Sequence, residues 1–263
     1  CARRGIHVIS EKPFAATVSE AEQALAVVEE AGIVFSLDIP AGCFTRPLEA
    51  AHNMTREGKV GAPRVVYCQV LQNRGPRFTY KMVDGRMVPP DYGELPNHGP
   101  YGFLASALAV GRPVTSVFAR RDVKFYEHYR AAGYEDMCLA AVSFAGGAVA
   151  NIVVGRTPTK SLPATDFRLE IIGSEGSIFV DDAMGDKMHV WAPYKAGDDP
   201  FDGGGLDFAY YSPVPVQRYI DDVVEAVLAG GRARIGVDQT RDCMRFIDGC
   251  YRSAACGQPV TFE

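Results

Sequence analysis

The chain has 263 residues, of which 47% are hydrophobic and 22% charged, so it can bury a sizeable core in one or two domains. Its formal net charge of −5 is spread over both signs without a run of lysine or arginine, which excludes the usual electrostatic footprint for nucleic acid or an anionic membrane. Seven cysteines without a C-x-x-C pair favour reduced thiols in a cytoplasmic protein and predict no metal site.

The first predicted elements form a strand–helix–strand unit. A short apolar strand in HVISEKPF (residues 7–14) ends in a charged pair, which costs desolvation energy unless the pair has partners or a function. A helix is predicted over 18–31, because Thr17 and Glu20 form a T-x-x-E capping box at its start. The apolar run IVFSLDI (33–39) predicts a strand covered on both faces, and strands joined through a helix are expected to pair in parallel.

A mainly β region follows a second helix, predicted over 47–56. Alternation of apolar and polar residues indicates strands joined mostly by short loops, which favours a largely antiparallel sheet. The predicted strands cover residues 64–72, 114–121, 166–173, 176–182 and 187–191. Two helices with apolar residues at helical spacing, 217–228 and 240–255, close the chain.

The uncharged segment 137–155 is nearly long enough to cross a membrane. Gly146 and Gly147 stand at its centre, however, and short β-prone runs lie on either side of them. This pattern favours a β-hairpin over a membrane span, so no membrane association is expected.

A long segment rich in proline, glycine and tyrosine (73–97) precedes a helix predicted over 101–110. Segments of this length in compact domains are commonly functional or disordered. Arginine and tyrosine side chains suit recognition of a polar small molecule, although solvated or packed roles are the more common alternative. The candidates of this kind are Arg46, Arg74, Arg77, Tyr80 and Tyr92.

Five segments occur in a specific order and spacing along the chain. They are GIHVISEKPFAATVSEAEQALAVVEEAGI, REGKVGAPRVV, GPYGFLASALAVGRPVTSVFA, FRLEIIGSEGSIFVDD and YIDDVVEAVLAGGRARIGVDQTRDCMRFIDGCYRSAACGQPVTF. Together they resemble the Gfo/Idh/MocA oxidoreductases, the family of glucose–fructose oxidoreductase and inositol dehydrogenase. The resemblance implies an α/β plus α+β fold. Residues 1–40 are expected to be the final βαβ portion of a Rossmann-like domain, and 41–263 an α+β substrate-binding and oligomerisation domain with a large, mostly antiparallel open sheet and helices on one face.

The resemblance also implies NAD or NADP as the cofactor, but the glycine-rich phosphate-binding fingerprint is absent. No G-x-G-x-x-G occurs in the sequence, since Gly203-Gly204-Gly205 lacks the next required glycine and follows no predicted strand. By the family's layout, the pyrophosphate site is expected upstream of Cys1. The N-terminal part of the Rossmann-like domain is therefore expected to be missing from this chain.

Lys12 matches the lysine of the family's E-K-P motif, and the resemblance makes it the first candidate catalytic residue. Hydride exchange at a carbinol carbon needs a hydrogen-bond donor or a cation near the reacting oxygen, which an ammonium group supplies. Glu11 is expected to hold this lysine, and Pro13 to fix the turn, where a cis peptide is allowed. Glu11, Lys12 and Pro13 are thus the candidate cofactor-binding residues; the alternative is an ordinary surface lysine.

The second half of the site is expected in N-H-G-P-Y (97–101), where family members commonly read D-x-G-x-H or D-x-G-x-Y. Tyr101 falls on the His/Tyr position, and a nearby ammonium is expected to favour its tyrosinate form, so that it exchanges a proton with substrate. Asn97 stands in place of the usual aspartate and carries no charge, which implies either lost catalysis or a different acid/base arrangement. His98 is a further acid/base candidate, although neighbouring residues often point apart.

We therefore expect an NAD(P)-dependent oxidoreductase that transfers hydride between the nicotinamide and a hydroxyl-bearing carbon of a sugar or cyclitol. The alternative is a non-catalytic or truncated ligand-binding or oligomerisation module derived from the same family. The expected partners are a small sugar or polyol and further copies of the chain, which form a dimer or tetramer through the open sheet. No nucleic-acid partner is expected.

Overall fold

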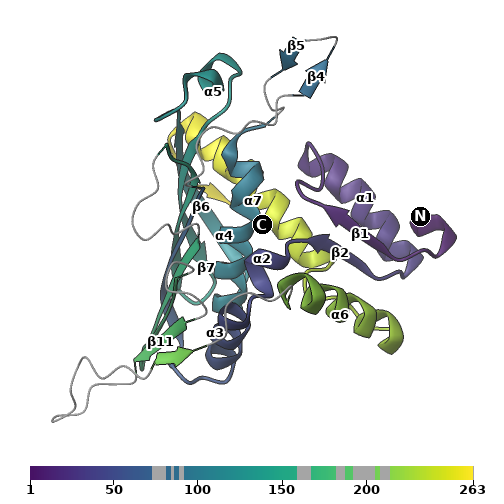
Figure 1. The fold of residues 1–263 in the computed structure, drawn as a ribbon, viewed down its shortest axis with the longest axis vertical. Helices are drawn as coiled ribbons and strands as arrows, with labels where there is room; N and C mark the ends of the chain where they lie inside the picture. The colour runs from purple at the N-terminus through teal and green to yellow at the C-terminus, as the bar shows by residue number, and fades with distance from the viewer. Residues whose placement is uncertain are drawn as a thin grey trace.

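Two sheets of different size organise the chain in the computed structural model (Figure 1). The structure describes residues 1–72, 81–83, 86–88, 92–158, 167–181, 187–191, 205–207 and 214–262. In chain order, the elements are the 3₁₀ turn η1 (Ala2–Arg4), β1 (Val8–Glu11), α1 (Val18–Ala31), β2 (Phe35–Asp38), α2 (Pro40–Cys43), α3 (Arg46–Arg56), β3 (Pro63–Gln72), β4 (Lys81–Val83), β5 (Arg86–Val88), α4 (Glu94–Val110), β6 (Val114–Asp122), α5 (Glu127–Ala131), β7 (Met137–Phe144), β8 (Val149–Arg156), β9 (Phe167–Gly173), β10 (Ser177–Asp181), β11 (Lys187–Trp191), β12 (Gly205–Asp207), α6 (Val214–Ala229), α7 (Val237–Cys256) and β13 (Val260–Thr261).

The small sheet is the predicted strand–helix–strand unit. β1 and β2 pair in parallel, with Glu11 opposite Asp38 at their C-terminal ends. α1 covers the predicted residues and its capping box is present, since Thr17 and Glu20 each accept the backbone N–H of the other. A small apolar cluster joins α1 to β2: Leu25, Val28 and Phe35. The parallel βαβ unit is therefore confirmed.

The large sheet has nine strands in the order β12-β11-β10-β9-β3-β8-β7-β6-β13. Every neighbouring pair is antiparallel except β3 and β8, which run in parallel. The prediction of a largely antiparallel sheet is therefore confirmed. The exception follows from the chain order, because a parallel pair needs a crossover connection and α4 provides one between β3 and β8.

Residues 137–155 form the predicted hairpin of β7 and β8. Gly146 and Gly147 lie in its turn with φ of 88° and 86°, a backbone conformation that residues with a Cβ rarely adopt. Among the described residues, no helix combines the length and the apolar character that a membrane crossing requires.

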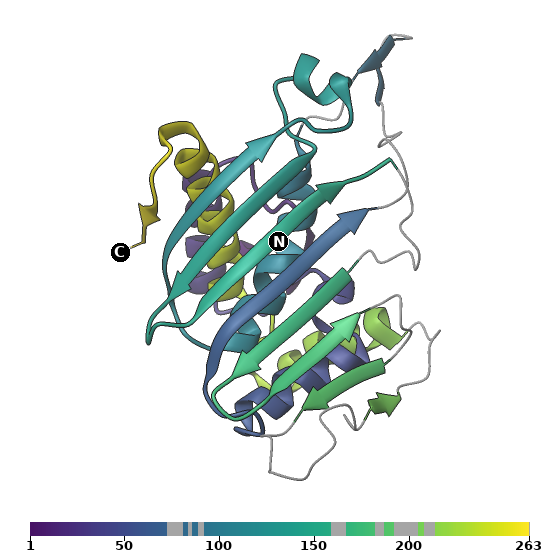
Figure 2. The same ribbon diagram turned by 90° about the vertical axis from the view of Figure 1, so that its left-hand side faces the viewer.

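Helices cover one face of the large sheet, and in the described part of the chain the opposite face carries none (Figure 2). Along β3, Val66 and Cys68 are buried toward the helices, whereas the intervening Tyr67 is 47% exposed on the other face. α4 approaches this sheet closely because Gly102 lacks a side chain: a Cβ there would lie 2.9 Å from Ile152 Cγ2. The predicted open sheet with helices on one face is thus confirmed.

The C-terminal helices return to the N-terminal unit (Figure 1). Arg241 of α7 donates to Glu22 at 2.8 Å and to Glu29 at 2.9 Å, both on α1. The backbone oxygen of Ile235 accepts the Leu37 N–H of β2 at 3.0 Å. These contacts give the small sheet a defined position against α7 and bring the end of β1 to the first half of α4.

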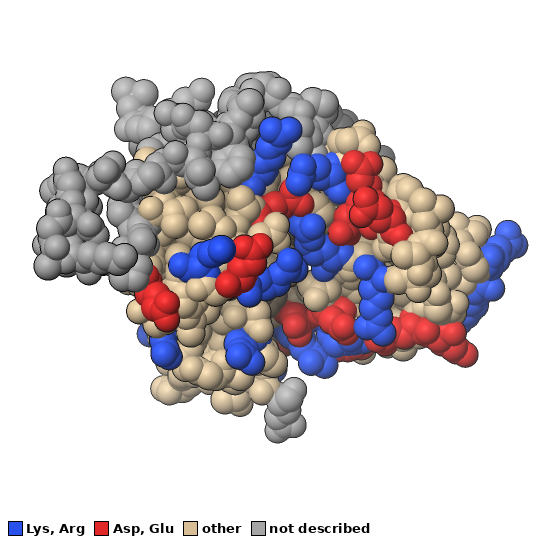
Figure 3. Space-filling view, turned by 90° about the horizontal axis from the view of Figure 1, so that it is seen from below, with Lys and Arg blue, Asp and Glu red and all other residues tan. Residues whose placement is uncertain are grey.

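Charged side chains of both signs are interspersed over the face of the molecule seen in Figure 3. Ion pairs between elements occur in the described part of the chain, such as Arg218 and Arg234 with Glu49. Among the described residues on this face, neither sign forms an extended patch of its own.

Candidate functional site

The end of β1 meets the first half of α4, and the residues predicted from the sequence converge there. Lys12 Nζ donates to the Asn97 backbone oxygen at 2.8 Å and to Asn97 Oδ1 at 2.7 Å. The same ammonium lies 5.2 Å from the centre of the Tyr101 ring, within cation–π range. The Lys12–Pro13 peptide is cis. The tertiary structure thus joins two motifs that are 85 positions apart in the sequence.

α4 begins at Glu94, whereas the sequence predicts a helix from Tyr101. Two prolines in the intervening segment explain the error, because proline usually marks a turn or a helix boundary. The helix start is held from outside the helix: the Leu95 N–H donates to Glu135 Oε1 at 2.9 Å, and the Glu94 N–H to the Glu135 backbone oxygen at 3.0 Å. All the predicted site residues in N-H-G-P-Y therefore lie on α4 itself.

Sequence reasoning missed Glu94, which is fully buried at the centre of the site. Its Oε1 accepts hydrogen bonds from Arg156 Nε at 3.0 Å and from the Tyr129 hydroxyl. Its Oε2 accepts from Asn97 Nδ2 at 3.0 Å and lies 2.7 Å from His98 Nδ1. Burial alone would raise the pKa of Glu94, but the hydrogen bonds of His98 and Tyr129 and the positive charge of Arg156 hold it well below its usual range. The carboxylate is therefore ionised at neutral pH.

Helical spacing is the one signal in the sequence that points to Glu94. Asn97 and His98 follow it by three and four positions, so the three side chains share a face of any helix that includes all of them. The other two partners carry no such signal, because Tyr129 and Arg156 come from α5 and β8.

His98 belongs to the same network, so the expectation that it points away from Asn97 is wrong. Its Nε2 lies 3.4 Å from Asn97 Nδ2, and its Nδ1 faces Glu94. Burial lowers the pKa of His98; Glu94 opposes this effect, whereas the positive charges of Lys12 and Arg156 add to it. The imidazole is therefore neutral at pH 7, because the ordinary pKa of histidine is already below that value.

Tyr101 behaves differently from the sequence-based expectation. Burial, and then the negative charges of Glu11 and Asp38, raise the pKa of Tyr101 to about 12. The expected lowering by Lys12 is therefore wrong, because burial and carboxylates outweigh the ammonium. The neutral hydroxyl is a hydrogen-bond donor. The ring of Tyr101 packs on Gly42 of α2, where a Cβ would lie only 2.8 Å from the ring Cδ1.

Two carboxylates stand at the C-terminal ends of the parallel strands. Glu11 Oε2 accepts the backbone N–H of Lys12 at 3.0 Å, so Glu11 holds the main chain at this lysine. Burial and the neighbouring Glu11 raise the pKa of Asp38, and Lys12 opposes them. In α/β folds the ends of parallel strands are the usual place for a nucleotide.

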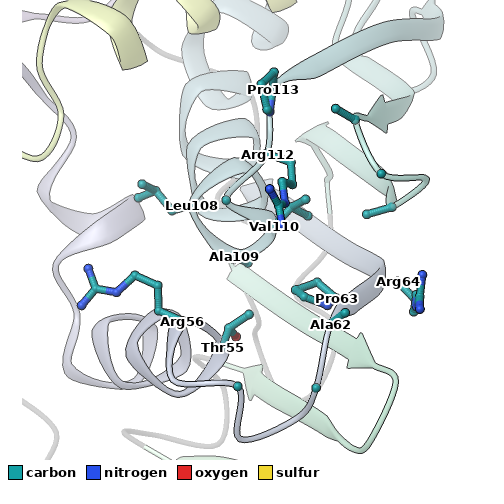
Figure 4. A pocket seen from close by; sticks show the side chains of 16 residues that line it. Thr55, Arg56, Ala62, Pro63, Arg64, Leu108, Ala109, Val110, Arg112 and Pro113 are labelled. Carbon is teal, nitrogen blue, oxygen red and sulfur yellow. The ribbon is translucent and has the colours of Figure 1, made fainter.

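The cluster does not line the described cavity, and of the other arginine and tyrosine candidates only Arg46 and Tyr92 fall within the described residues. Arg74, Arg77 and Tyr80 fall outside the described residues, and Arg46 is exposed at the start of α3. A cavity of about 670 Å³ lies at the opposite end of α4, lined there by residues 108–111 (Figure 4). None of the predicted catalytic or cofactor-binding residues lines this cavity.

Two family models match the chain. The model of the GFO/IDH/MocA C-terminal domain matches residues 48–179. The model of an oxidoreductase family with an NAD-binding Rossmann fold matches residues 1–39.

Two curated proteins are similar to most of this chain. The uncharacterized oxidoreductase YrbE of Bacillus subtilis (strain 168) is 23% identical over 98% of this chain and 71% of its own length. The myo-inositol 2-dehydrogenase of Thermotoga maritima is 24% identical over 86% of this chain and 61% of its own length. The chain thus spans only part of each of these relatives.

Solved structures share the fold over nearly the whole chain. The aldose-aldose oxidoreductase of Caulobacter crescentus, complexed with glycerol, has a TM-score of 0.79 and 23% identity, covering 99% of this chain and 73% of that one. A levoglucosan dehydrogenase in complex with NADH and L-sorbose has a TM-score of 0.77 and 19% identity, covering 100% of this chain and 74% of that one. Since the C-terminal family model matches half of the chain and a Rossmann-fold model matches its start, the chain belongs to the Gfo/Idh/MocA oxidoreductase family.

Proposed function

We propose that this protein is an NAD(P)-dependent oxidoreductase that transfers hydride between a nicotinamide and a hydroxyl-bearing carbon of a sugar or cyclitol. The position of Lys12 supports this most directly, since two oxygens of Asn97 hold its ammonium beside the Tyr101 ring at the end of a parallel strand. The names of two similar proteins, myo-inositol 2-dehydrogenase and levoglucosan dehydrogenase, agree with such a substrate class.

Lys12 and Tyr101 are proposed to contact the reacting oxygen. In the direction of reduction, hydride adds to the carbonyl carbon and the oxygen takes up a proton. The ammonium of Lys12 stabilises the negative charge that develops on this oxygen, and the neutral hydroxyl of Tyr101 donates the proton. In the direction of oxidation, Tyr101 accepts the proton of the substrate hydroxyl. The pKa of Tyr101 is about 12, so the deprotonated form that accepts this proton becomes more populated at high pH.

The residues at the strand ends suit the nicotinamide end of a dinucleotide better than its phosphates. Glu11, Lys12 and Pro13 stand where a parallel strand ends, next to the half-buried Tyr101. The carboxylates of Glu11 and Asp38 would repel a pyrophosphate placed beside them, and the sequence contains no G-x-G-x-x-G. When bound, the nicotinamide of NAD or NADP would supply the hydride acceptor or donor.

The proposed division of the chain places residues 1–40 in the nucleotide-binding part and 41–263 in the substrate-binding and oligomerisation part. The separate parallel sheet of β1 and β2 supports this division. The two parts are also in contact with each other: Arg241 of α7 pairs with both Glu22 and Glu29 of α1.

The test is nicotinamide-dependent turnover with a panel of aldoses and cyclitols, followed through the nicotinamide absorbance. Lys12→Met should lower kcat/KM by about 100-fold or more, because a preorganised donor at the reacting oxygen is lost. Lys124→Met is the matched control, since this lysine side chain is 56% exposed and pairs with Asp122 on the surface. Unchanged turnover in Lys12→Met would exclude the proposed role. Binding of nicotinamide and sugar without any turnover would favour the non-catalytic alternative.

A further inference from the structure

Glu94, Asn97 and Lys12 form a continuous chain of hydrogen bonds. Asn97 Nδ2 donates to Glu94 Oε2 at 3.0 Å, and Asn97 Oδ1 accepts from Lys12 Nζ at 2.7 Å. Glu94 is 0% and Asn97 6% exposed, so bulk water competes little for these bonds. The Asn97 backbone oxygen holds the same ammonium at 2.8 Å, and the direction of the Asn97 amide decides whether the second of these two hydrogen bonds forms.

The chemistry of the two ends of this chain decides the orientation of the amide. An ammonium group has only donors, so Lys12 requires the amide oxygen; an ionised carboxylate only accepts, so Glu94 requires the amide nitrogen. The hydrogen bonds from Arg156 and Tyr129 keep Glu94 ionised and occupy its other oxygen. Both ends therefore demand the same orientation of Asn97.

The same carboxylate selects the tautomer of His98. Because Nδ1 lies 2.7 Å from Glu94 Oε2, the proton of the neutral ring belongs on Nδ1. Nε2 is then an acceptor, which is what the Asn97 amide at 3.4 Å requires. The short contact at Nδ1 and the amide beside Nε2 both favour this arrangement of protons.

We infer that Glu94 is a positioning residue, which supplies from the preceding helical turn the negative charge that Asn97 lacks and thereby sets the polarity of the Glu94–Asn97–Lys12 chain. Glu94 does not contact the substrate in this arrangement; it acts through Asn97 on Lys12. Its effect on turnover rests on the proposed function, whereas the arrangement of protons does not.

The first experiment measures the tautomer of His98 by nitrogen NMR of histidine-labelled protein, with His98→Gln assigning the signal. In the wild-type protein we expect the neutral Nδ1–H form. In Glu94→Gln we expect a shift toward the Nε2–H form, because the glutamine amide now donates to Nδ1. An Nε2–H or doubly protonated ring in the wild-type protein at pH 7 would overturn the inference. The wild-type measurement depends neither on the folding of the Glu94→Gln variant nor on turnover.

The second experiment is a double-substitution cycle on turnover. Glu94→Gln should lower kcat by about 100-fold with little change in KM, because the amide of Asn97 loses its fixed direction and Lys12 shifts. Asn97→Asp should also lower kcat, since it places a second carboxylate against Glu94. The double variant Glu94→Gln/Asn97→Asp restores one charge between Lys12 and Arg156, and about tenfold of the lost kcat should return.

The outcomes separate this inference from the proposed function. If the decreases in kcat of the two single variants simply add in the double variant while the expected His98 tautomer is present, Glu94 only stabilises the fold. That result would overturn its positioning role. If no variant and no wild-type protein turns over a sugar or cyclitol, the proposed function fails. The tautomer of His98 then still decides whether Glu94 sets the arrangement of protons. Circular dichroism and thermal melting confirm that each variant is folded.

Discussion

Tyr101 shows, at the scale of one residue, that burial outweighs a nearby cation. Lys12 Nζ lies 5.2 Å from the ring centre, so its charge faces the π electrons of the ring. Removing the hydroxyl from water disfavours the phenolate, and Glu11 and Asp38 add electrostatic repulsion. The hydroxyl therefore stays protonated throughout the neutral and mildly alkaline range.

A titration of Tyr101 tests this raised pKa. The pKa of about 12 in the folded protein lies above the value of about 10 for an unfolded tyrosine, so folding favours the neutral form. The raised pKa of Tyr101 therefore adds to the free energy of unfolding below about pH 10. This contribution is lost as the pH rises from about 10 to about 12. Carbon NMR of labelled tyrosine should show one signal, absent from Tyr101→Phe, that titrates near pH 12. Titration of that signal at or below pH 10 would contradict the assignment.

Gly42 is the second residue on which the shape of the site depends. A Cβ at this position would lie 2.8 Å from Tyr101 Cδ1 and 2.9 Å from Ile39 Cγ2. Gly42→Ala should therefore displace the Tyr101 ring and lower the free energy of unfolding by about 1–3 kcal/mol, measured by urea denaturation. Gly231→Ala is the matched control, since its Cβ would meet nothing closer than 3.9 Å. Equal stability of the two variants would show that α2 moves freely away from α4.

α4 is the element that carries most of the site, and its start depends on a residue from another segment. Glu135 is 1% exposed and accepts hydrogen bonds from the Leu95 N–H and from the Tyr251 hydroxyl. Burial raises the pKa of Glu135, and its hydrogen bonds and Arg121 oppose this effect. Any side chain at Gly93 would overlap the Glu135 carboxylate, so a glycine at the N-cap leaves room for this cap from outside the helix.

Removal of this external cap should loosen the beginning of α4. Glu135→Ala leaves the Leu95 N–H and the Tyr251 hydroxyl without their acceptor, so the free energy of unfolding should fall by about 2 kcal/mol. Hydrogen exchange of the Leu95 amide should become faster by a larger factor than exchange in α7. Glu127→Ala, whose side chain is 79% exposed, should change neither quantity. Unchanged exchange at Leu95 in Glu135→Ala would contradict the proposed cap.

At the scale of the whole molecule, the uncovered face of the large sheet is the proposed oligomer interface. Apolar side chains project from its central strands, with Tyr67 47%, Leu139 50% and Val149 39% exposed. Burial of these side chains against a second copy would remove apolar surface from water, which is the usual driving force for stable association. The long helices of the described part of the chain lie on the other side of the sheet (Figure 2).

The oligomeric state of two variants tests this interface. Leu139→Glu places a charge on the exposed sheet face and should shift the protein toward the monomer in sedimentation or light-scattering measurements, because burying an unpaired charge is costly. Leu228→Glu is the control, since this leucine is 82% exposed on α6, away from the sheet face. Dissociation by Leu228→Glu but not by Leu139→Glu would place the interface elsewhere.

Local sequence determined the elements whose signals lie within them. The boundaries of α1 follow from its own capping box, the β7–β8 hairpin from its two turn glycines, and the strands from alternation of apolar and polar residues. Each of these signals is short-range, because a capping residue, a turn or a strand face is defined by neighbours in the chain. The roles expected of Lys12 in E-K-P and of Tyr101 in N-H-G-P-Y came instead from the resemblance to the family.

The start of α4 and the electrostatics of the site depend on residues that are far apart in the sequence. The cap of α4 comes from Glu135, 40 positions after Leu95, and the partners of Glu94 come from three separate elements. The direction of the pKa shift at Tyr101 likewise depends on burial and on Asp38 from the neighbouring strand. Hydrogen-bond partners and desolvation are set by the packing of distant segments, and for that reason the sequence pointed to Lys12, Asn97, His98 and Tyr101 but neither to Glu94 nor to the protonation states of the site.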